Sequence, residues 1–352
     1  MTNTDSATTA PAIAVYGATG HTGGHILNEL RDRGLNPILV GRNAERLRVA
    51  ADAAGLPDAE IRVADLSDHA ALLAAFTGVD VVISALFAFV DFGGAVLSAA
   101  IEAGADYTDT SGEQQFLRRV FEEYGPLAEK AGVTVVSGVT DNNLAADLLA
   151  DLVTARLSGP AELVVTHHSR SGGNGSKGSA KTVLANLDWF RDGGWHYADG
   201  ELLTGPADRH RTLLFPGTDT PAPVEKSPQS AVLTIPRHTD VSYVAGAIDP
   251  KFLANLSSFT PEALESIPDA PDSDLSYDVI VDGYAADGTQ VRGVVTGTDS
   301  YRDSALLTVE VAARLATGIA RPGALAPAEA FDAREFLDSL RPHGITTTIG
   351  EI

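Results

Sequence analysis

The chain has 352 residues, 44% of them hydrophobic, and a formal net charge of −22 at pH 7. So acidic a surface repels nucleic acid and anionic membranes, and the lack of cysteine excludes disulfides, thiolate metal sites and a cysteine nucleophile. No apolar stretch reaches the roughly 20 residues of a membrane span, and the polar residues 1–11 lack the features of a signal peptide. We therefore expect a cytoplasmic protein of two domains that begins with a disordered lead-in over residues 1–11.

Residues 12–42 predict a strand, a glycine turn, a helix and a second strand. The apolar run 12–16 leads into Gly17-Ala-Thr-Gly20-His-Thr-Gly23, and apolar residues at helical spacing continue until Gly34 ends the helix. This order of elements holds the pyrophosphate of a dinucleotide, because glycine allows a tight turn and the helix start offers free N–H groups. A glycine-rich turn without a ligand is the structural alternative.

Arg42 follows the second strand of this unit, at the place where an NAD site usually has Asp or Glu for the ribose 2′-hydroxyl. No carboxylate stands there to repel a 2′-phosphate, and a guanidinium suits phosphate geometry. The sequence therefore favours NADP(H) as the cofactor. A solvated surface arginine at a strand end is the alternative interpretation.

The alternation of strands and helices continues to residue 157. We expect strands at 60–64, 79–85, 106–109 and 134–137, with helices at 44–54, 68–76, 93–103 and 114–131, the last interrupted near Gly125. Carboxyl ends of parallel strands face the cofactor, which places Asp65 near the adenine and residues 84–89 near the nicotinamide. The predicted cofactor-binding residues are Gly17, Thr19, Gly20, His21, Thr22, Gly23, Arg42, Asp65, Leu66, Ser84 and Ala85.

The composition changes after residue 157. Strands are expected at 162–169, 202–215 and 230–235 and in a hairpin at 277–295, helices at 179–191 and 261–267, and loops at 217–228 and 268–274. A helix at 300–317 needs an apolar partner and is expected to pack on the first domain. The predicted fold is α/β: a Rossmann-like doubly wound parallel sheet domain (12–157 plus about 299–352), with an α+β substrate or dimerisation domain (158–298) containing a largely antiparallel sheet.

Five segments carry a family pattern: YGATGHTGG, VGRNAERL, AAIEAGADYTDTSGEQQFL, the SGGN turn at 171–174 and the segment from VTGTDSYRDSALL to FLDSL. Together they resemble the saccharopine-dehydrogenase-like NAD(P)-dependent oxidoreductases over nearly the whole chain. The resemblance implies a split Rossmann domain with an inserted sheet domain, and NAD(P) chemistry on imines, amines or related carbonyls. Three departures lie near the expected substrate side: Ala85-Leu-Phe-Ala-Phe89 instead of Gly-Pro-Tyr, Gly138-Val-Thr-Asp141 instead of a proline-containing turn, and SGGN instead of SGGT.

Tyr107, Asp109 and Glu113 match the family segment below the nicotinamide and are the predicted catalytic residues. Hydride chemistry usually needs one group that exchanges a proton, but a helix cap is an equal interpretation of each carboxylate. Asp141, His167 and His168 are further candidates, and the two histidines point to opposite faces because they are adjacent in a strand. Lys177 and Lys181 could bind a substrate carboxylate.

The residues support an NADP(H)-dependent reductase or dehydrogenase that acts on a C=N, C=O or activated C=C bond of a small metabolite. A non-catalytic NADP-binding redox sensor or scaffold is the alternative, and an enzyme that holds NAD(P) internally for a non-redox reaction is a third. No P-loop, nucleophile elbow or metal-binding spacing occurs, so no metal is expected. The sequence leaves open whether the chain forms a homodimer.

Overall fold

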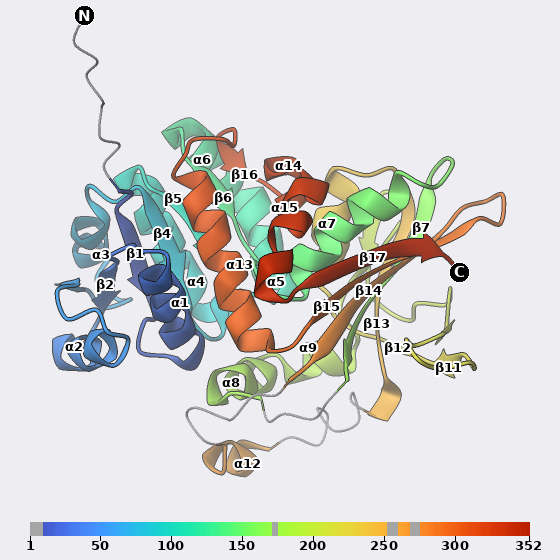
Figure 1. Ribbon diagram of the computed structural model, residues 1–352, viewed down its shortest axis with the longest axis horizontal. Helices are drawn as coiled ribbons and strands as arrows, with labels where there is room; N and C mark the ends of the chain where they lie inside the picture. The colour runs from blue at the N-terminus through green and yellow to red at the C-terminus, as the bar shows by residue number, and fades with distance from the viewer. Residues whose placement is uncertain (1–9, 171–174, 252–259, 268–274) are drawn as a thin grey trace, which may run out of the picture.

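The computed structural model describes residues 10–170, 175–251, 260–267 and 275–352, and its strands form two large sheets (Figure 1). Residues 1–9 of the expected lead-in, the SGGN turn at 171–174 and the expected loop at 268–274 lie outside the described residues. The first sheet is entirely parallel, with the order β16-β6-β5-β4-β1-β2-β3. Its strands are β1 (Ile13–Tyr16), β2 (Ile38–Gly41), β3 (Glu60–Val63), β4 (Val81–Ser84), β5 (Asp106–Asp109), β6 (Thr134–Val136) and β16 (Gly323–Ala324).

The six strands from the amino-terminal part have the order expected of a dinucleotide-binding sheet. β1 and β4 are buried along their whole length, which explains their continuous apolar runs. The order reverses between β1 and β4, and their carboxyl ends open a crevice there. The helices of this part are α1 (His21–Asp32), α2 (Ala44–Ala53), α3 (His69–Phe76), α4 (Phe89–Ala103), α5 (Gln114–Arg119), the π-helical turn Val120–Tyr124 and α6 (Gly125–Ala131).

Two boundaries in this part differ from the sequence prediction. Helix α4 begins at Phe89 rather than at residue 93, and the interruption of the predicted 114–131 helix is a π-helical turn at Val120–Tyr124. The early start of α4 has a physical cause, because a carboxylate from another element accepts a hydrogen bond from the Phe89 N–H. Local sequence does not reveal such a distant cap.

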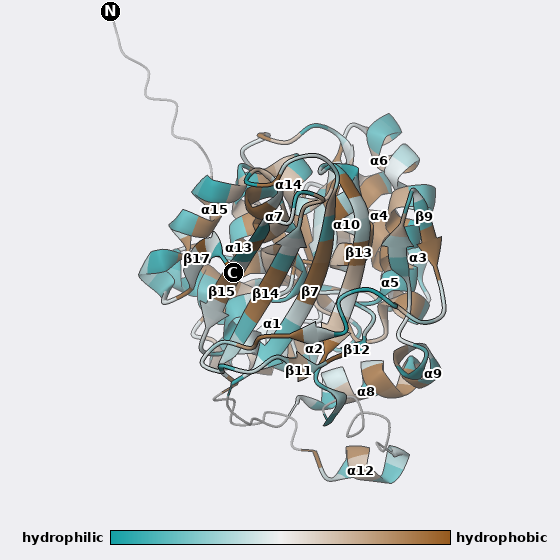
Figure 2. Ribbon diagram, turned by 90° about the vertical axis from the view of Figure 1, so that its right-hand side faces the viewer, coloured by the Kyte–Doolittle hydropathy of each residue, from teal (hydrophilic) through white to brown (hydrophobic). Residues whose placement is uncertain are grey.

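The second sheet is mixed, with β7 and β13 parallel and its other pairs antiparallel. Figure 2 shows β15, β14, β7 and β13 side by side in that order. The β14–β15 hairpin turns at Ala286-Asp-Gly-Thr289 as predicted, with the Ala285 N–H donating to the Thr289 carbonyl. The strands are β7 (Ala161–Ser169), β8 (His196–Ala198), β9 (Glu201–Leu203), β12 (Glu225–Lys226), β13 (Val241–Ile248), β14 (Tyr277–Tyr284), β15 (Gln290–Gly297) and β17 (Thr346–Glu351).

The prediction of a strand at 230–235 was wrong. Residues Ala231–Thr234 form helix α10, followed by a 3₁₀ turn at Ile235–Arg237. The next strand along the chain, β13, begins after that turn, at Val241. A short buried apolar run does not distinguish strand from helix by its periodicity. The predicted strand at 202–215 also shrinks to β9 and to β10 (Thr212–Leu213), which pairs with β11 (Ala222–Pro223) inside the expected 217–228 loop. The expected helices appear as α8 (Lys177–Ala185), α9 (Leu187–Arg191) and α12 (Pro261–Glu265).

The carboxyl-terminal segment is shared between the two sheets. Helix α13 (Ser300–Leu315) packs against α1, β4 and β5, and β16 then joins the edge of the parallel sheet. After α14 (Pro327–Ala330), α15 (Ala333–Ser339) and a 3₁₀ turn at Arg341–His343, β17 joins β15 of the second sheet. Helix α7 (Asn143–Thr154) lies against β14 and β15, and one apolar core runs from the first sheet through α7 into the second (Figure 1). No described helix is both long and apolar enough to span a bilayer.

Candidate functional site

The glycine turn has the close backbone packing that a dinucleotide cradle requires. Gly17 has a φ of +95°, and a Cβ on it would lie 2.3 Å from the Ala85 carbonyl oxygen. A Cβ on Gly23 would lie 2.2 Å from the Gly17 carbonyl oxygen, which is why α1 can approach β1 so closely. The Gly20 N–H donates to the Gly17 oxygen at 3.0 Å and closes the turn. Thr19 and Gly20 are exposed at the mouth, while His21 and Thr22 are half-buried.

Arg42 is exposed at the carboxyl end of β2, beside Asp65 at the end of β3 and Tyr16 at the end of β1. Asp65 accepts hydrogen bonds from the Ser67 hydroxyl at 2.6 Å and the Ser67 N–H at 3.0 Å, and these, with the nearby Arg42, lower its pKa. Burial, followed by the charge of Asp65, raises the pKa of Tyr16 to about 12. Leu66, next along the chain, is half-buried. The predicted adenine side therefore carries one exposed guanidinium and one exposed carboxylate.

The loop that leaves β4 is held in an unusual conformation. Ala88 has a φ of +47°, a left-handed conformation that costs a residue with a side chain about 1–2 kcal/mol. The Ala88 N–H donates to the Thr182 hydroxyl of α8 at 3.2 Å, and the Phe89 N–H donates to Glu113 at 2.7 Å. The loop presents Phe87 at 40% exposure, and its ring meets that of Phe92 at 5.5 Å.

The predicted catalytic residues are close to one another but buried. Tyr107 is fully buried in the apolar core, and burial, followed by the charge of Asp109, raises the pKa of its hydroxyl. Asp109 pairs in register with Ser84, a fully buried residue at the end of β4, and accepts from the Ser137 hydroxyl and from the N–H groups of Ser111 and Gly138. These bonds join β5 to the end of β6.

Glu113 is the N-cap residue of α5 by position, yet its side chain does not cap that helix. It accepts from Phe89 N at the start of α4 and from Gly112 N at 3.1 Å. Burial raises the pKa of both Asp109 and Glu113 against these hydrogen bonds. The contacts of all three residues are those of a structural network, and their catalytic roles stay predictions.

A second polar cluster forms where β6, β7 and α13 meet. The sequence analysis gave two of its members, Asp141 and His167, as further candidates. The Asp141 carboxylate lies 3.0 Å from His167 Nε2 and accepts from the Ser300 hydroxyl at 2.9 Å and the Ser304 hydroxyl at 3.0 Å. The His167 ring stacks on Tyr277 with 5.4 Å between ring centroids and keeps 20% of its side chain exposed. His168 points to the opposite face, against Phe215, as the strand alternation predicted. Only the fold brings Asp141 to His167, because 26 residues separate them.

The start of α13 closes over the glycine turn. The ring of Tyr301 lies 4.8 Å from that of His21, and its hydroxyl accepts from the Ser176 N–H at 2.6 Å and lies 2.9 Å from the Ser179 hydroxyl. Burial lowers the pKa of His21, whose Nε2 is buried without a hydrogen-bond partner in the described part of the chain. Lys181 lies 5.0 Å over the Phe87 ring and Lys177 faces Glu265 at 3.8 Å. No group of three or more potential metal ligands occurs among the described residues.

Comparison with known proteins agrees with this geometry. Residues 13–136 match the family model of the saccharopine dehydrogenase NADP binding domain. Over 97% of its length the chain superposes on all of the apo saccharopine dehydrogenase (L-Glu forming) of Saccharomyces cerevisiae, with a TM-score of 0.61 at 15% identity. In its family-model match, its fold and one of its relatives the chain is similar to saccharopine-dehydrogenase-like proteins. The predicted fold class is confirmed.

Sequence relatives match this chain over a shorter stretch. A lipid droplet localized protein of Caenorhabditis elegans is 32% identical over 146 residues, and a trans-acting enoyl reductase of Mycobacterium ulcerans is 32% identical over 142. A probable mitochondrial saccharopine dehydrogenase-like oxidoreductase of Arabidopsis thaliana is 30% identical over 149 residues. Each alignment covers 39% of this chain and about a third of the relative.

Proposed function

We propose that the protein is an NADP(H)-dependent reductase or dehydrogenase of a small metabolite. The observation that carries the proposal is the glycine turn, in which the absence of Cβ atoms at Gly17 and Gly23 keeps backbone within reach of a pyrophosphate. The exposed Arg42 at the end of β2 supports NADP(H) over NAD(H). The match of residues 13–136 to an NADP binding domain points the same way.

The residues of this crevice divide into three groups by their place on the parallel sheet. Backbone from Gly17 to Gly23 would hold the pyrophosphate, Arg42 and Asp65 the adenosine half, and Ser84 and Ala85 would border the nicotinamide half. A bound nicotinamide supplies or accepts a hydride. The loop at 85–89 and the start of α13 would then exclude water from one side of that ring.

We further propose that the Asp141–His167 pair exchanges the proton. His167 is the more accessible partner, with 20% of its side chain exposed against 8% for Asp141, and the carboxylate fixes the ring orientation through Nε2. The two serine hydroxyls on Asp141 hold it in place. Tyr107, Asp109 and Glu113 stay as predicted alternatives, and their burial favours His167 over them.

The bond that is reduced is proposed as C=N, C=O or activated C=C. The enoyl reductase among the relatives favours a C=C bond. Phe87, in the loop after β4, is 40% exposed, and Phe92, in the first turn of α4, is 37% exposed. These two rings favour a substrate with an apolar portion. A cytoplasmic location and a homodimer also stay proposals.

The test is NADPH consumption, followed by absorbance, with a panel of enals, keto acids and imines. We expect turnover with at least one member, and we expect His167→Gln to lower it about 10²- to 10⁴-fold while NADPH affinity stays within a few-fold. His168→Gln is the matched control, because it changes the same side chain on the opposite face of β7 and should leave turnover nearly unchanged. Equal loss in both variants would remove His167 from the reaction, and the same assay on Tyr107→Phe and Asp109→Asn would then locate the donor.

The non-catalytic alternative makes the opposite prediction in the same assay. A redox sensor or scaffold would bind NADPH and consume none with any panel member. Turnover with a single substrate therefore rejects it. The substitution of the family turn by Ala85-Leu-Phe-Ala-Phe89 is the feature that favours this alternative.

A further inference from the structure

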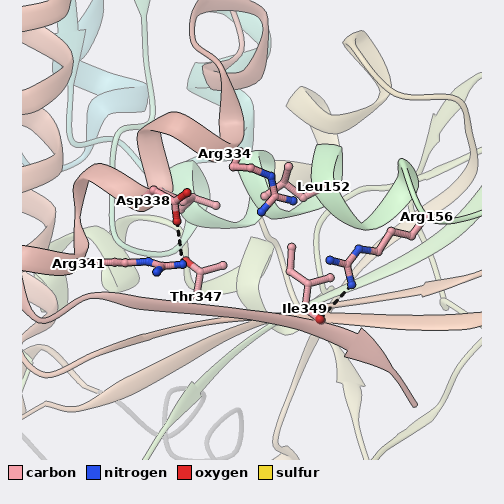
Figure 3. A pocket seen from close by; sticks show the side chains of 8 residues that line it. Leu152, Arg156, Arg334, Asp338, Arg341, Thr347 and Ile349 are labelled. Carbon is pink, nitrogen blue, oxygen red and sulfur yellow. Dashed lines mark hydrogen bonds and ion pairs between the residues drawn. The ribbon is translucent and has the colours of Figure 1, made fainter.

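A small pocket of about 80 Å³ lies away from the glycine turn, where α7, α15 and β17 meet (Figure 3). Its apolar floor consists of Leu152, Leu337 and Ile349, and its polar lining consists of Arg156, Arg334, Asp338, Arg341 and Thr347. The arginines come from three different segments of the chain: the turn just after α7, α15 and the 3₁₀ turn after α15. Tertiary structure alone brings them together.

The lining carries excess positive charge in a protein whose net charge is −22. Arg341 is paired with Asp338 at 2.9 Å, and Arg156 donates to the Ile349 carbonyl at 3.0 Å without a carboxylate partner. Within the described ranges, the side chain of Arg334 makes no hydrogen bond or ion pair. The guanidinium groups of Arg156 and Arg334 therefore lack a carboxylate partner among the described residues, and in Figure 3 the only dashed line to a carboxylate joins Arg341 to Asp338.

Thr347 supplies the second, independent observation. Its hydroxyl oxygen is buried and lacks a hydrogen-bond partner among the described residues, although a buried hydroxyl normally has one. Thr347 and Ile349 lie two apart on β17 and so share the strand face that borders the pocket. A ligand oxygen would satisfy this hydroxyl where it reaches past the pocket lining that covers it.

From these observations we propose that the pocket binds a phosphate-type oxyanion, either inorganic phosphate or the phosphate group of a small monoester. Guanidinium groups match the geometry of phosphate oxygens and keep their charge at all relevant pH values. The apolar floor lowers the local dielectric constant and strengthens these contacts. Because the pocket joins α7, α15 and β17, the anion also fastens the carboxyl-terminal strand to the rest of the molecule.

Titration of the full chain with inorganic phosphate, at constant ionic strength against chloride, tests the proposal by ³¹P NMR or calorimetry with saturating NADP⁺ present. We expect saturable binding that Arg334→Gln weakens at least about 10-fold and Thr347→Val weakens about 3- to 10-fold. Arg334 is exposed and unpaired in the described structure, so its replacement should not unfold the protein. Glycerol 1-phosphate in place of phosphate distinguishes a monoester ligand, by tighter binding, from the free anion.

Two control variants distinguish phosphate binding in the pocket from phosphate binding to other cationic residues on the surface. Thr348→Val changes the neighbouring, exposed threonine of β17, and Arg211→Gln removes an exposed arginine outside the pocket. Both should bind phosphate as the wild type does. The proposal fails if the wild type shows no saturable phosphate binding, if Arg334→Gln binds as tightly as the wild type, or if only Arg42→Ala, at the cofactor turn, weakens binding.

Discussion

Glu113 shows what a single residue can and cannot reveal in the sequence. Its position before α5 predicts an N-cap, yet its carboxylate reaches back 24 residues to the Phe89 N–H and caps α4. The reason is that Phe89 follows the left-handed Ala88, and both residues are buried, so the Phe89 N–H needs an acceptor. Asp109 likewise serves as an acceptor for three groups across the β5 and β6 ends. Sequence identified both carboxylates as special, and only the fold reveals their partners.

His238 and Asp147 form a buried pair outside the proposed site, and they carry a prediction about pH. His238 Nε2 lies 2.9 Å from Asp147, and the exposed fractions of the two side chains are 7% and 0%. Burial alone would lower the pKa of His238, but the charge and hydrogen bond of Asp147 outweigh it and raise the pKa above its ordinary value. The protonated form is therefore favoured in the folded state.

A raised folded-state pKa gives this pair a definite effect on stability. Its contribution is fully present below the unfolded pKa of about 6.5 and is lost as pH rises through the folded value. We expect the free energy of unfolding of the wild type, relative to His238→Gln, to be larger near pH 6 than near pH 9. Denaturant titrations at the two pH values measure it. A difference that grows with pH, or a His238 NMR titration midpoint below about 6.5, would contradict the pairing.

Helix α1 contains two adjacent glycines, and replacing each of them with alanine should have opposite effects. A Cβ at Gly23 would meet the Gly17 oxygen at 2.2 Å and the Ala18 backbone at 2.9 Å, whereas a Cβ at Gly24 would meet nothing within 4 Å. Gly24→Ala should leave NADPH binding intact and stabilise the helix by about 0.5–1 kcal/mol. Gly23→Ala should push α1 from β1 and weaken NADPH binding at least about 10-fold.

Fluorescence titration with NADPH, together with thermal unfolding, compares the two glycine variants. The pair is informative because both changes add one methyl group to the same turn of the same helix. Equal affinities in Gly23→Ala and Gly24→Ala would mean that the close packing of α1 on β1 does not shape the cofactor site.

The elements that sequence predicted well are those with strong local signals. The buried parallel strands, α1 and the β14–β15 hairpin follow from apolar runs, helical spacing and a turn of Asp-Gly type. The prediction of a strand at 230–235 failed because the apolar run there is short and would be buried in either conformation. The pairing of β17 with β15 could not be predicted from the sequence either, since it joins residues 50 to 60 positions apart.

At the scale of the whole molecule, the chain builds one continuous core from two sheets, and the candidate site lies where they meet. Sequence could place the cofactor turn, because its signal is local and complete within residues 12–42. It could not choose Asp141 and His167 over Tyr107 and Asp109, since that choice depends on burial and on the return of α13 to the first sheet. The proposed proton-transfer pair is thus brought together by topology.

We propose that this fold binds NADP(H) and that Arg42 selects it. A charge-assisted contact to the 2′-phosphate contributes on the order of 1.5–3 kcal/mol, so Arg42→Ala should weaken NADPH binding roughly 10- to 150-fold and leave NADH binding nearly unchanged. Dissociation constants for both cofactors, measured with wild type and Arg42→Ala, test this most directly. We expect tighter binding of NADPH than of NADH in the wild type and no preference in Arg42→Ala. Equal wild-type affinities, or an equal loss for both cofactors in Arg42→Ala, would contradict it.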